Sequence, residues 1–525
     1  MLQTLAADVD RDSNTTPGTG RQFRRLLERP RILVIGWLAV VTIFNLLTLL
    51  SFPAPFVDEA WGANRAWALL QTGRAFGTMD QGVFQRFPGY WTYFPWLGTA
   101  IHAATIWAFG LSLSSMRLTS LIFGLILLVA IYTIARRLLG TKAGLLALLL
   151  TSVSPTFLRA SHLGRDDIVV TALGFGAIAL YLTDRSTGIP FQSVLCGLLV
   201  GLTLDIHPNG MIFGPAIAAL YLYDRGPRLV RSIRFWGFAT GSAAGVGFFV
   251  TKHLVAYPET YTALSRQFYG VWREPPLFVL DPSTWLQSIV GLGFVLVQSS
   301  DAKLVIVLIA SYAFLRSGSK AERRLIVIFL ALAFGFAALI RFKVTEYDVL
   351  IAPAADLVVA GYLCHLMAGP PLRSRSRMIK LTLIPLAGSL ALALAVTIAG
   401  LASPGLSDYQ TVVANLQATV APGASVMGPQ TYWFGLTDHS YLSLEQIAYF
   451  QSFTPGASVE DALRSLHPDY LILDRQSDQF VVADRATLPP FFTFLYVSKP
   501  GLVTFLSAHA RLAREVKTTT YGDVS

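Results

Sequence analysis

The sequence has 525 residues, of which 53% are hydrophobic and only 14% are charged. Soluble domains carry about 25% charged residues, so this composition excludes an ordinary soluble protein and favours a polytopic helical membrane protein. The formal net charge of +10 does not indicate nucleic-acid binding, because Lys and Arg collect in the cytoplasmic loops of membrane proteins and set their orientation.

The N-terminal segment is polar to about residue 20, and this composition predicts disorder. The basic cluster RQFRRLLERPR follows directly before the first apolar run and predicts a cytoplasmic N-terminus. We therefore expect residues 1–30 to form a cytoplasmic tail.

Apolar runs long enough to cross a bilayer recur through residues 31–402, which we predict to form one transmembrane domain. The candidate spans are 31–52, 117–138, 143–160, 167–184, 191–207, 209–223, 235–254, 301–316, 324–341, 347–367 and 380–402. Eleven spans place all the basic loops on one side. Two further apolar stretches, near 95–112 and 285–299, do not fit this parity. We predict that they lie in the membrane interface or re-enter it, and 13 spans would follow if both crossed.

Residues 53–116 are predicted to form a long external loop that is rich in aromatic side chains. After residue 403 the pattern changes. The stretch SDYQTVVANLQATVAPGASVMG predicts a helix, a Pro-Gly turn and a strand, and SVEDALRSLHPDYLILD repeats this order with Ser458 as the helix cap. Alternation of helix and strand implies a small α/β domain over residues 403–525, which the parity places on the extracytoplasmic side.

Polar side chains stand where two of the predicted spans meet the external side. Asp58 and Glu59 follow the first span, and two solvated loop acids would be the simplest explanation of this pair alone. The next external turn, LGRDD, carries Arg165, Asp166 and Asp167. We expect Asp166 to cap the following helix. Asp167 then lies in the first turn of a membrane helix, where an acid must face protein or a water-filled cavity.

Two later segments add further polar groups. The stretch LDIHPNGMIF interrupts an apolar run with His207, and polar breaks at membrane depth are often functional. The stretch IRFKVTEYDVLIAPAADLVVA opens a late span with Arg341, Lys343 and Tyr347. Cations at an outer helix end run against the charge rule, so they indicate an anionic ligand such as a lipid phosphate. Pairing with Glu346 is the alternative explanation.

Together these segments predict a polar pocket at the outer surface of the bilayer, with paired carboxylates, cations and many aromatic rings. Aromatic rings stack on sugars, and a carboxylate can act as a general base towards a hydroxyl. Cations suit a phosphate leaving group. The chemistry implied is glycosyl transfer from a lipid-linked phosphate sugar.

The order of VDEAW, MRLTSLIFGLILLVAIYTIARRLLG, LGRDD and FKVTEYDVLIAPAADLVV resembles the C-type (GT-C) membrane glycosyltransferases of the protein O-mannosyltransferase and aminoarabinose-transferase group. The resemblance covers roughly residues 30–370. It implies a GT-C-like fold, a polyprenyl-phosphate sugar donor and transfer with inversion at the anomeric carbon. It also implies that Asp58, with Glu59 beside it, is the catalytic or metal-proximal carboxylate, and that Asp167 and Arg165 are the second acid and its arginine.

On this hypothesis the catalytic residues are Asp58, Glu59 and Asp167. The residues expected to bind the donor or its phosphate are Arg165, His207, Arg341, Lys343 and Tyr347. The sequence requires no cofactor, although a divalent cation could be shared by Asp58 and Asp167. The first loop lacks an EKPP-like segment, which speaks against a lipid A acceptor.

Two other classes of protein stay open. A transporter or flippase of a lipid-linked saccharide would also use intramembrane acids and broken helices, and a scaffold could bind a partner through the outer domain. Polar groups clustered on one face, without matching halves of the chain, favour the enzyme. We expect it in the plasma (inner) membrane, with the active site outside and a cell-envelope glycan, glycolipid or protein as the acceptor.

Overall fold

The computed structural model describes residues 30–81, 96–183, 190–269, 303–340, 344–368, 373–488 and 495–525. The chain forms two units, Met1–Leu46 and Leu47–Ser525. The described part of the first unit belongs to helix α3 (Pro30–Thr48), which is long and apolar enough to cross a membrane.

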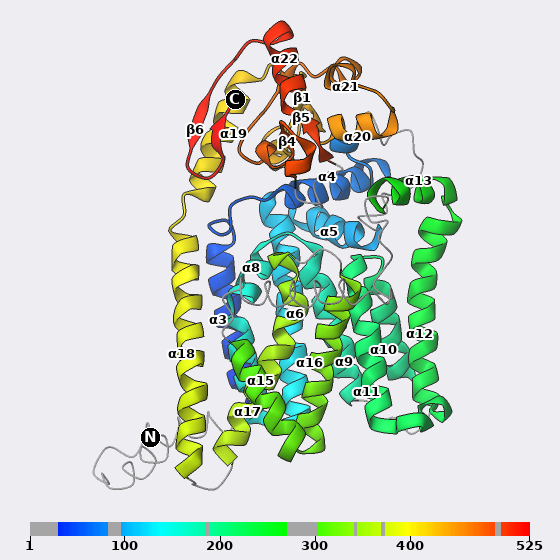
Figure 1. Ribbon diagram of the computed structural model, residues 1–525, viewed down its shortest axis with the longest axis vertical. Helices are drawn as coiled ribbons and strands as arrows, with labels where there is room; N and C mark the ends of the chain where they lie inside the picture. Colours follow the sequence, from blue (N-terminus) through cyan, green and yellow to red (C-terminus); the bar gives the residue numbers. More distant parts are fainter. Residues whose placement is uncertain are drawn as a thin grey trace, which may run out of the picture. The chain divides into compact units, whose positions relative to one another are not determined.

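The second unit is mainly helical (Figure 1). Its membrane-domain helices are α4 (Val57–Thr72), α5 (Trp96–Phe109), α6 (Leu113–Leu139), α7 (Thr141–Ser152), α8 (Pro155–His162), α9 (Asp166–Thr183), α10 (Phe191–Thr203), α11 (Phe213–Arg225), α12 (Ile233–Phe249), α13 (Pro258–Tyr269), α15 (Lys303–Ser317), α16 (Lys320–Leu339), α17 (Ala352–Ala368) and α18 (Arg373–Leu401). Short helical turns connect some of them, including η1 (Thr78–Asp80), η3 (Pro208–Ile212), η4 (Gly226–Arg231) and η6 (Thr345–Leu350).

Each of the eleven predicted spans overlaps a helix or a helix pair, which confirms a helical fold with several apolar helices. By length and composition alone, four described helical segments could cross a membrane: Pro30–Thr48, Leu113–Leu139, Asp166–Thr183 and Thr382–Thr419. The predicted span 143–160 is instead a pair, α7 and α8, bent by 63°, and would be a fifth if the pair counts as one span. The apolar stretch near 285–299 lies outside the described residues.

Helices α10 and α12 pack with their backbones in close contact. Each carries two glycines four residues apart, Gly197 and Gly201 in GLLVG and Gly241 and Gly245 in GSAAG. A Cβ atom on Gly197 or on Gly241 would lie 2.0 Å from a backbone oxygen of the facing helix. This is the small-xxx-small arrangement that lets membrane helices approach closely, and the two pentapeptides are a sequence signal for it.

Helices α4 and α5 run across one end of the helical bundle rather than along it (Figure 1). Helix α5 is the apolar stretch near 95–112, and its place in the membrane interface stays a prediction. Figure 1 shows α6 and α9 running away from this end, so their first turns lie near α4 and their last turns lie at the far end.

The C-terminal part has the predicted alternation of helices and strands. Its helices and strands are α19 (Gly405–Thr419), β1 (Ser425–Gly428), η7 (Gln430–Gly435), β2 (Ser440–Ser443), α20 (Gln446–Phe453), α21 (Val459–Leu466), β3 (Tyr470–Leu471), β4 (Val481–Val482), β5 (Val497–Ser498), α22 (Lys499–His509), β6 (Val516–Thr518) and β7 (Gly522–Val524). Strand β1 lies between β2 and β3, and both pairings are parallel. Ser458 caps α21 as predicted, because its Oγ accepts a hydrogen bond from the Asp461 N–H at 3.1 Å.

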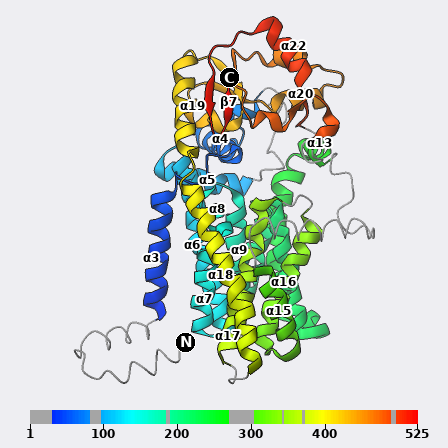
Figure 2. The ribbon, with the colours of Figure 1, turned by 60° about the vertical axis from the view of Figure 1, so that its left-hand side comes forward.

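The C-terminal part and residues 53–116, the predicted external loop, share one hydrophobic core, which the sequence did not indicate. Trp61 and Met79 from the loop belong to the same buried cluster as Trp433 and Tyr441. The Gln446 side chain also donates to the Met79 carbonyl oxygen at 3.1 Å. Both views show α4 beneath the C-terminal strands (Figures 1 and 2). The segment that carries Asp58 and Glu59 is therefore held between the bundle and the C-terminal part.

Candidate active site

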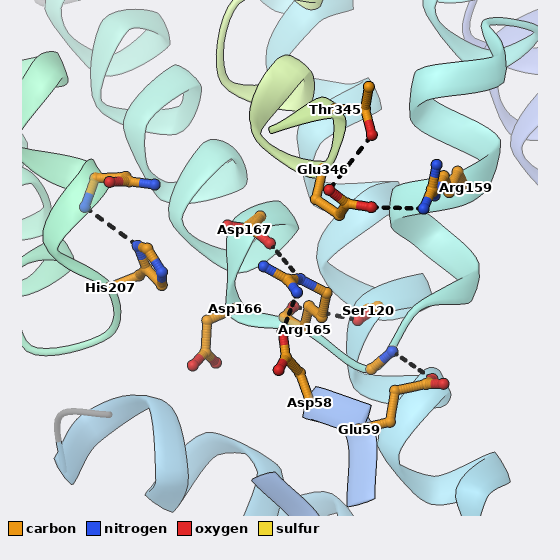
Figure 3. A network of polar contacts seen from close by, with 12 residues as sticks. Asp58, Glu59, Ser120, Arg159, Arg165, Asp166, Asp167, His207, Thr345 and Glu346 are labelled. Carbon is orange, nitrogen blue, oxygen red and sulfur yellow. Dashed lines mark hydrogen bonds and ion pairs between the residues drawn. The ribbon is translucent and has the colours of Figure 1, made fainter. Parts of the chain in front are cut away.

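The two adjacent acids of α4 face different environments. Glu59 turns into the protein and pairs with Arg117 of α6, whose Nε and Nη2 donate to its two carboxylate oxygens at 2.8 and 2.9 Å. Both side chains are completely buried. The sequence hypothesis counted Glu59 among the catalytic residues, beside Asp58. The structure instead places it away from the other acids, because successive helix residues point about 100° apart (Figure 3).

Glu59 also joins two loops. Its carboxylate accepts backbone N–H groups from Gly164 at 2.8 Å and from Phe56 at 3.0 Å. Gly164 directly precedes Arg165, and Phe56 lies two residues before Asp58. Glu59 is therefore a positioning residue, since one buried carboxylate fixes both segments from which the polar cluster is built.

Asp58 and Asp167 meet on the guanidinium of Arg165 (Figure 3). Arg165 Nη1 donates to Asp58 Oδ2, and Arg165 Nε donates to Asp167 Oδ2 at 2.8 Å. The rings of Phe56 and Tyr347 lie 5.6 and 6.0 Å from the guanidinium carbon, within the range of cation–π contacts. The structure thus brings together residues that lie 107 positions apart in the sequence.

The environment of Asp58 suits proton transfer. Its side chain keeps 27% of its surface exposed, so a substrate can reach it. Enclosure by the protein raises the pKa of the Asp58 carboxyl above its ordinary value, Arg165 opposes this rise, and the negative charges of Asp167 and Glu346 add to it. A carboxylate with a raised pKa is a better general base.

Asp167 and His207 complete the cluster. Asp167 Oδ1 is buried and has no hydrogen-bond partner in the described part of the chain. The His207 ring lies 5.6 Å from the Tyr347 ring in an edge arrangement, and its Nδ1 accepts the Asn209 N–H at 3.2 Å. Arg341 and Lys343, the two predicted phosphate ligands of the same late segment, lie outside the described residues.

Two buried acid–histidine pairs hold α5 beside the cluster. The side chains of His102 and Asp166 meet at 3.1 Å, and those of His253 and Asp205 at 2.5 Å. Asp205 also accepts the Leu97 N–H at 3.1 Å. Sequence reasoning assigned no role to the two histidines. The signal available was the position of His102 as an isolated titratable residue in an apolar helix and that of His253 at the end of an apolar run.

A small cavity adjoins Asp167. It measures about 20 Å³ and is lined in part by Arg159, Arg165 and Glu346. Arg159 donates to Glu346 at 2.5 Å. The alternative explanation of Arg341 and Lys343, pairing with Glu346, concerns cations outside the described residues and stays a prediction. This volume accommodates about one water molecule.

The sharing of a divalent cation by Asp58 and Asp167 stays a prediction. In the structure the two carboxylates are bridged by the guanidinium of Arg165. Among the described residues, no group of three or more His, Cys, Asp or Glu side chains could hold a metal ion.

The fold and the cluster define a class of polytopic membrane proteins in which a carboxylate pair lies at one end of a helical bundle, under transverse helices. A sequence profile of the family described as dolichyl-phosphate-mannose-protein mannosyltransferase matches residues 92–254. The chain is also 27% identical over 283 residues, or 52% of its length, to a polyprenol-phosphate-mannose–protein mannosyltransferase of Corynebacterium glutamicum. The chain spans about half of that relative, since the match covers 49% of it.

Solved structures show the same fold. The chain is similar to ArnT from Cupriavidus metallidurans bound to undecaprenyl phosphate, with a TM-score of 0.54, 15% identity, and coverage of 78% of this chain and 85% of that chain. The apo state of the same protein gives a TM-score of 0.51 at 16% identity, with coverage of 78% and 86%. The chain therefore has the fold of the C-type membrane glycosyltransferases, and the resemblance seen in the sequence is confirmed.

Proposed function

We propose that the chain is an inverting glycosyltransferase that moves a sugar from a polyprenyl-phosphate-linked donor to an acceptor hydroxyl. The observation that carries this proposal is the Asp58–Arg165–Asp167 cluster, in which a reachable carboxylate with a raised pKa stands beside a fixed guanidinium. A base and a phosphate-binding cation are the two groups that such a transfer needs.

Asp58 is the general base in this mechanism. The acceptor hydroxyl oxygen attacks the anomeric carbon of the sugar, and the bond between that carbon and the phosphate oxygen breaks. The hydroxyl proton passes to the Asp58 carboxylate, while polyprenyl phosphate leaves with the bonding electron pair. A single displacement of this kind inverts the configuration at the anomeric carbon.

Arg165 stabilises the departing phosphate. Its Nε is held by Asp167, which fixes the plane of the guanidinium, while its Nη groups lie towards Asp58. Charge-assisted hydrogen bonds to a phosphate oxygen strengthen as negative charge develops on the leaving group. One such donor lowers the activation free energy by about 3 kcal/mol. His207 and Tyr347 line the same side, and we propose that they contact the sugar or the phosphate together with Arg341 and Lys343.

The relatives indicate which donor and acceptor to test first. The names of the matching family and of the C. glutamicum protein describe a lipid-phosphate mannose as the donor and a protein as the acceptor. Polyprenyl-phosphate mannose and protein hydroxyls are therefore the first substrates to test. We place the protein in the plasma membrane, with α4 and the C-terminal part on the extracytoplasmic side. The polar cluster gathers at one end of the bundle, which does not suit a transporter, because a transported substrate must reach its site from both sides.

The direct test uses the full chain in liposomes with polyprenyl-phosphate mannose labelled in the sugar. We expect label to move to acceptor protein and unlabelled polyprenyl phosphate to appear in equal amount. If mannose does not transfer, the same assay with lipid extracts of the native membrane identifies the donor. A chain that binds the donor but produces neither product from any extract would contradict an enzymatic function.

The pH dependence of transfer provides a separate prediction. Asp58 acts in its ionised form, so activity is lost as the pH falls through its raised pKa. Asp167 contributes to that rise, and Asp167→Asn is therefore expected to move the acidic limb of the kcat/KM profile to lower pH. Asp224→Asn, at the far end of the bundle, serves as the control and should leave the limb in place. If the acidic limb of the kcat/KM profile of Asp167→Asn stays at the same pH or moves to higher pH, Asp58 is excluded as the titrating base.

A further inference from the structure

A second polar site lies at the end of the bundle opposite Asp58. A cavity of about 400 Å³ opens there between α6, α9, α11, α12 and α16. Arg117, beside the active site, and Arg137, in the cavity wall, belong to the same helix and are 20 residues apart. At 1.5 Å per residue this separation is about 30 Å, close to the thickness of the hydrocarbon core of a bilayer.

The wall of this basic cavity carries a large excess of positive charge. Its cations come from four helices and are Arg137, Arg225, Arg234, Lys320 and Arg324. Asp224 is the only acid among the described lining residues. The lining therefore has four more cations than acids.

The single acid is already fully used. Asp224 Oδ1 accepts from Nε and Nη2 of Arg324 at 2.9 and 2.8 Å, and Oδ2 accepts from the Tyr181 hydroxyl at 2.6 Å. The Tyr181 and Tyr221 rings meet edge to face at 4.7 Å, which fixes the wall between α9 and α11. Asp224 thus orders the cavity and offsets one of the five positive charges of its lining, through ion pairs with Arg324 and Lys320.

We propose that this basic cavity binds a phosphate-bearing ligand, either the headgroup of an anionic lipid or a free phosphate. Guanidinium groups match phosphate oxygens in geometry and charge, and basic cavities between membrane helices at the cytoplasmic surface bind lipid headgroups. The usual excess of Lys and Arg in inner loops does not explain the arrangement, because it favours cations along a surface rather than around one cavity.

The test compares two pairs of substitutions in neighbouring positions. Arg225→Gln with Arg234→Gln removes two cations from the cavity wall. Arg228→Gln with Arg231→Gln removes two cations of η4, between them in sequence, that do not line it. Both pairs change the net charge equally, so they separate a site from general surface charge.

The full chain in a non-ionic detergent is titrated with a short-chain phosphatidylglycerol and, separately, with inorganic phosphate, and the melting temperature is followed. We expect saturable stabilisation of the natural chain by phosphatidylglycerol. The apparent Kd should be about tenfold to thirtyfold higher in the cavity pair, the variant with both cavity-wall substitutions, and within about twofold of the natural value in the control pair, the variant with both η4 substitutions. Saturation by phosphatidylglycerol alone identifies a headgroup site. Saturation by inorganic phosphate as well identifies a site for the phosphate group itself.

Two results would overturn the proposal: no stabilisation of the natural chain by either probe, or equal weakening in both pairs. If the cavity pair has a lower melting temperature than the natural chain without ligand, Lys320→Gln serves as the test variant instead. The Lys320 side chain is 61% exposed, so its replacement should not disturb the fold. That variant is expected to weaken binding severalfold, and unchanged binding would also speak against the site.

Discussion

Asp58→Asn is expected to reduce kcat for sugar transfer by about 10²- to 10⁴-fold, the usual contribution of a general base. Asn has the same shape as Asp and keeps an oxygen for Arg165 Nη1, so the fold and the position of the guanidinium should be preserved. It cannot accept the proton of the acceptor hydroxyl. The loss should therefore fall on kcat, while the KM for the lipid-linked donor changes little.

Asp166→Asn is the matched control for this substitution. Asp166 is an acid of the same polar region, but its side chain contacts His102 rather than Arg165. We expect its transfer rate to stay within about tenfold of that of the natural chain, because the substitution alters only the contact with His102, away from the reacting atoms. If Asp58→Asn retained as much activity as Asp166→Asn, Asp58 would not be the base and the mechanism above would be wrong.

Local sequence features predicted much of the fold. Apolar runs of membrane length identified the helices, and the Ser458 cap identified α21, because both signals act within a few residues of one another. The shared core that joins Trp61 to Trp433 was missed, since it depends on segments more than 300 residues apart. The spacing of Gly197 and Gly201 and of Gly241 and Gly245 was a sequence signal for close helix packing, but it did not say that α10 packs on α12.

Local sequence signals also predicted part of the candidate site. Asp58, Arg165 and Asp167 stand at or just before the start of a helix, at turns that the charge pattern of the loops assigned to the same side. The direction of a side chain was not readable: Asp58 and Glu59 are adjacent, yet one faces the cluster and the other Arg117. Arg117 itself looked like an ordinary charge near the start of a span, because its partner lies 58 positions earlier.

Arg117→Gln is expected to lower both stability and activity. It leaves the Glu59 carboxylate completely buried without a counter-charge, and it removes the hydrogen bond from Arg117 Nη1 to the Leu49 carbonyl oxygen at 2.8 Å. Breaking one partner of a buried pair costs about 3–5 kcal/mol. Since Glu59 also holds the segments before Asp58 and Arg165, transfer should fall through misplacement of those groups, by about 10²-fold for a shift near 1 Å.

The double variant Glu59→Gln with Arg117→Gln separates a buried charge from lost packing. When both charges are removed, the penalty of an unpaired carboxylate disappears, so the double variant should melt above Arg117→Gln and below the natural chain. Its transfer rate should stay low, because a neutral amide side chain in place of Glu59 holds the Gly164 and Phe56 N–H groups more weakly than a carboxylate does. A double variant that melts below Arg117→Gln would mean that packing, and not the buried charge pair, fixes the two loops that carry the site.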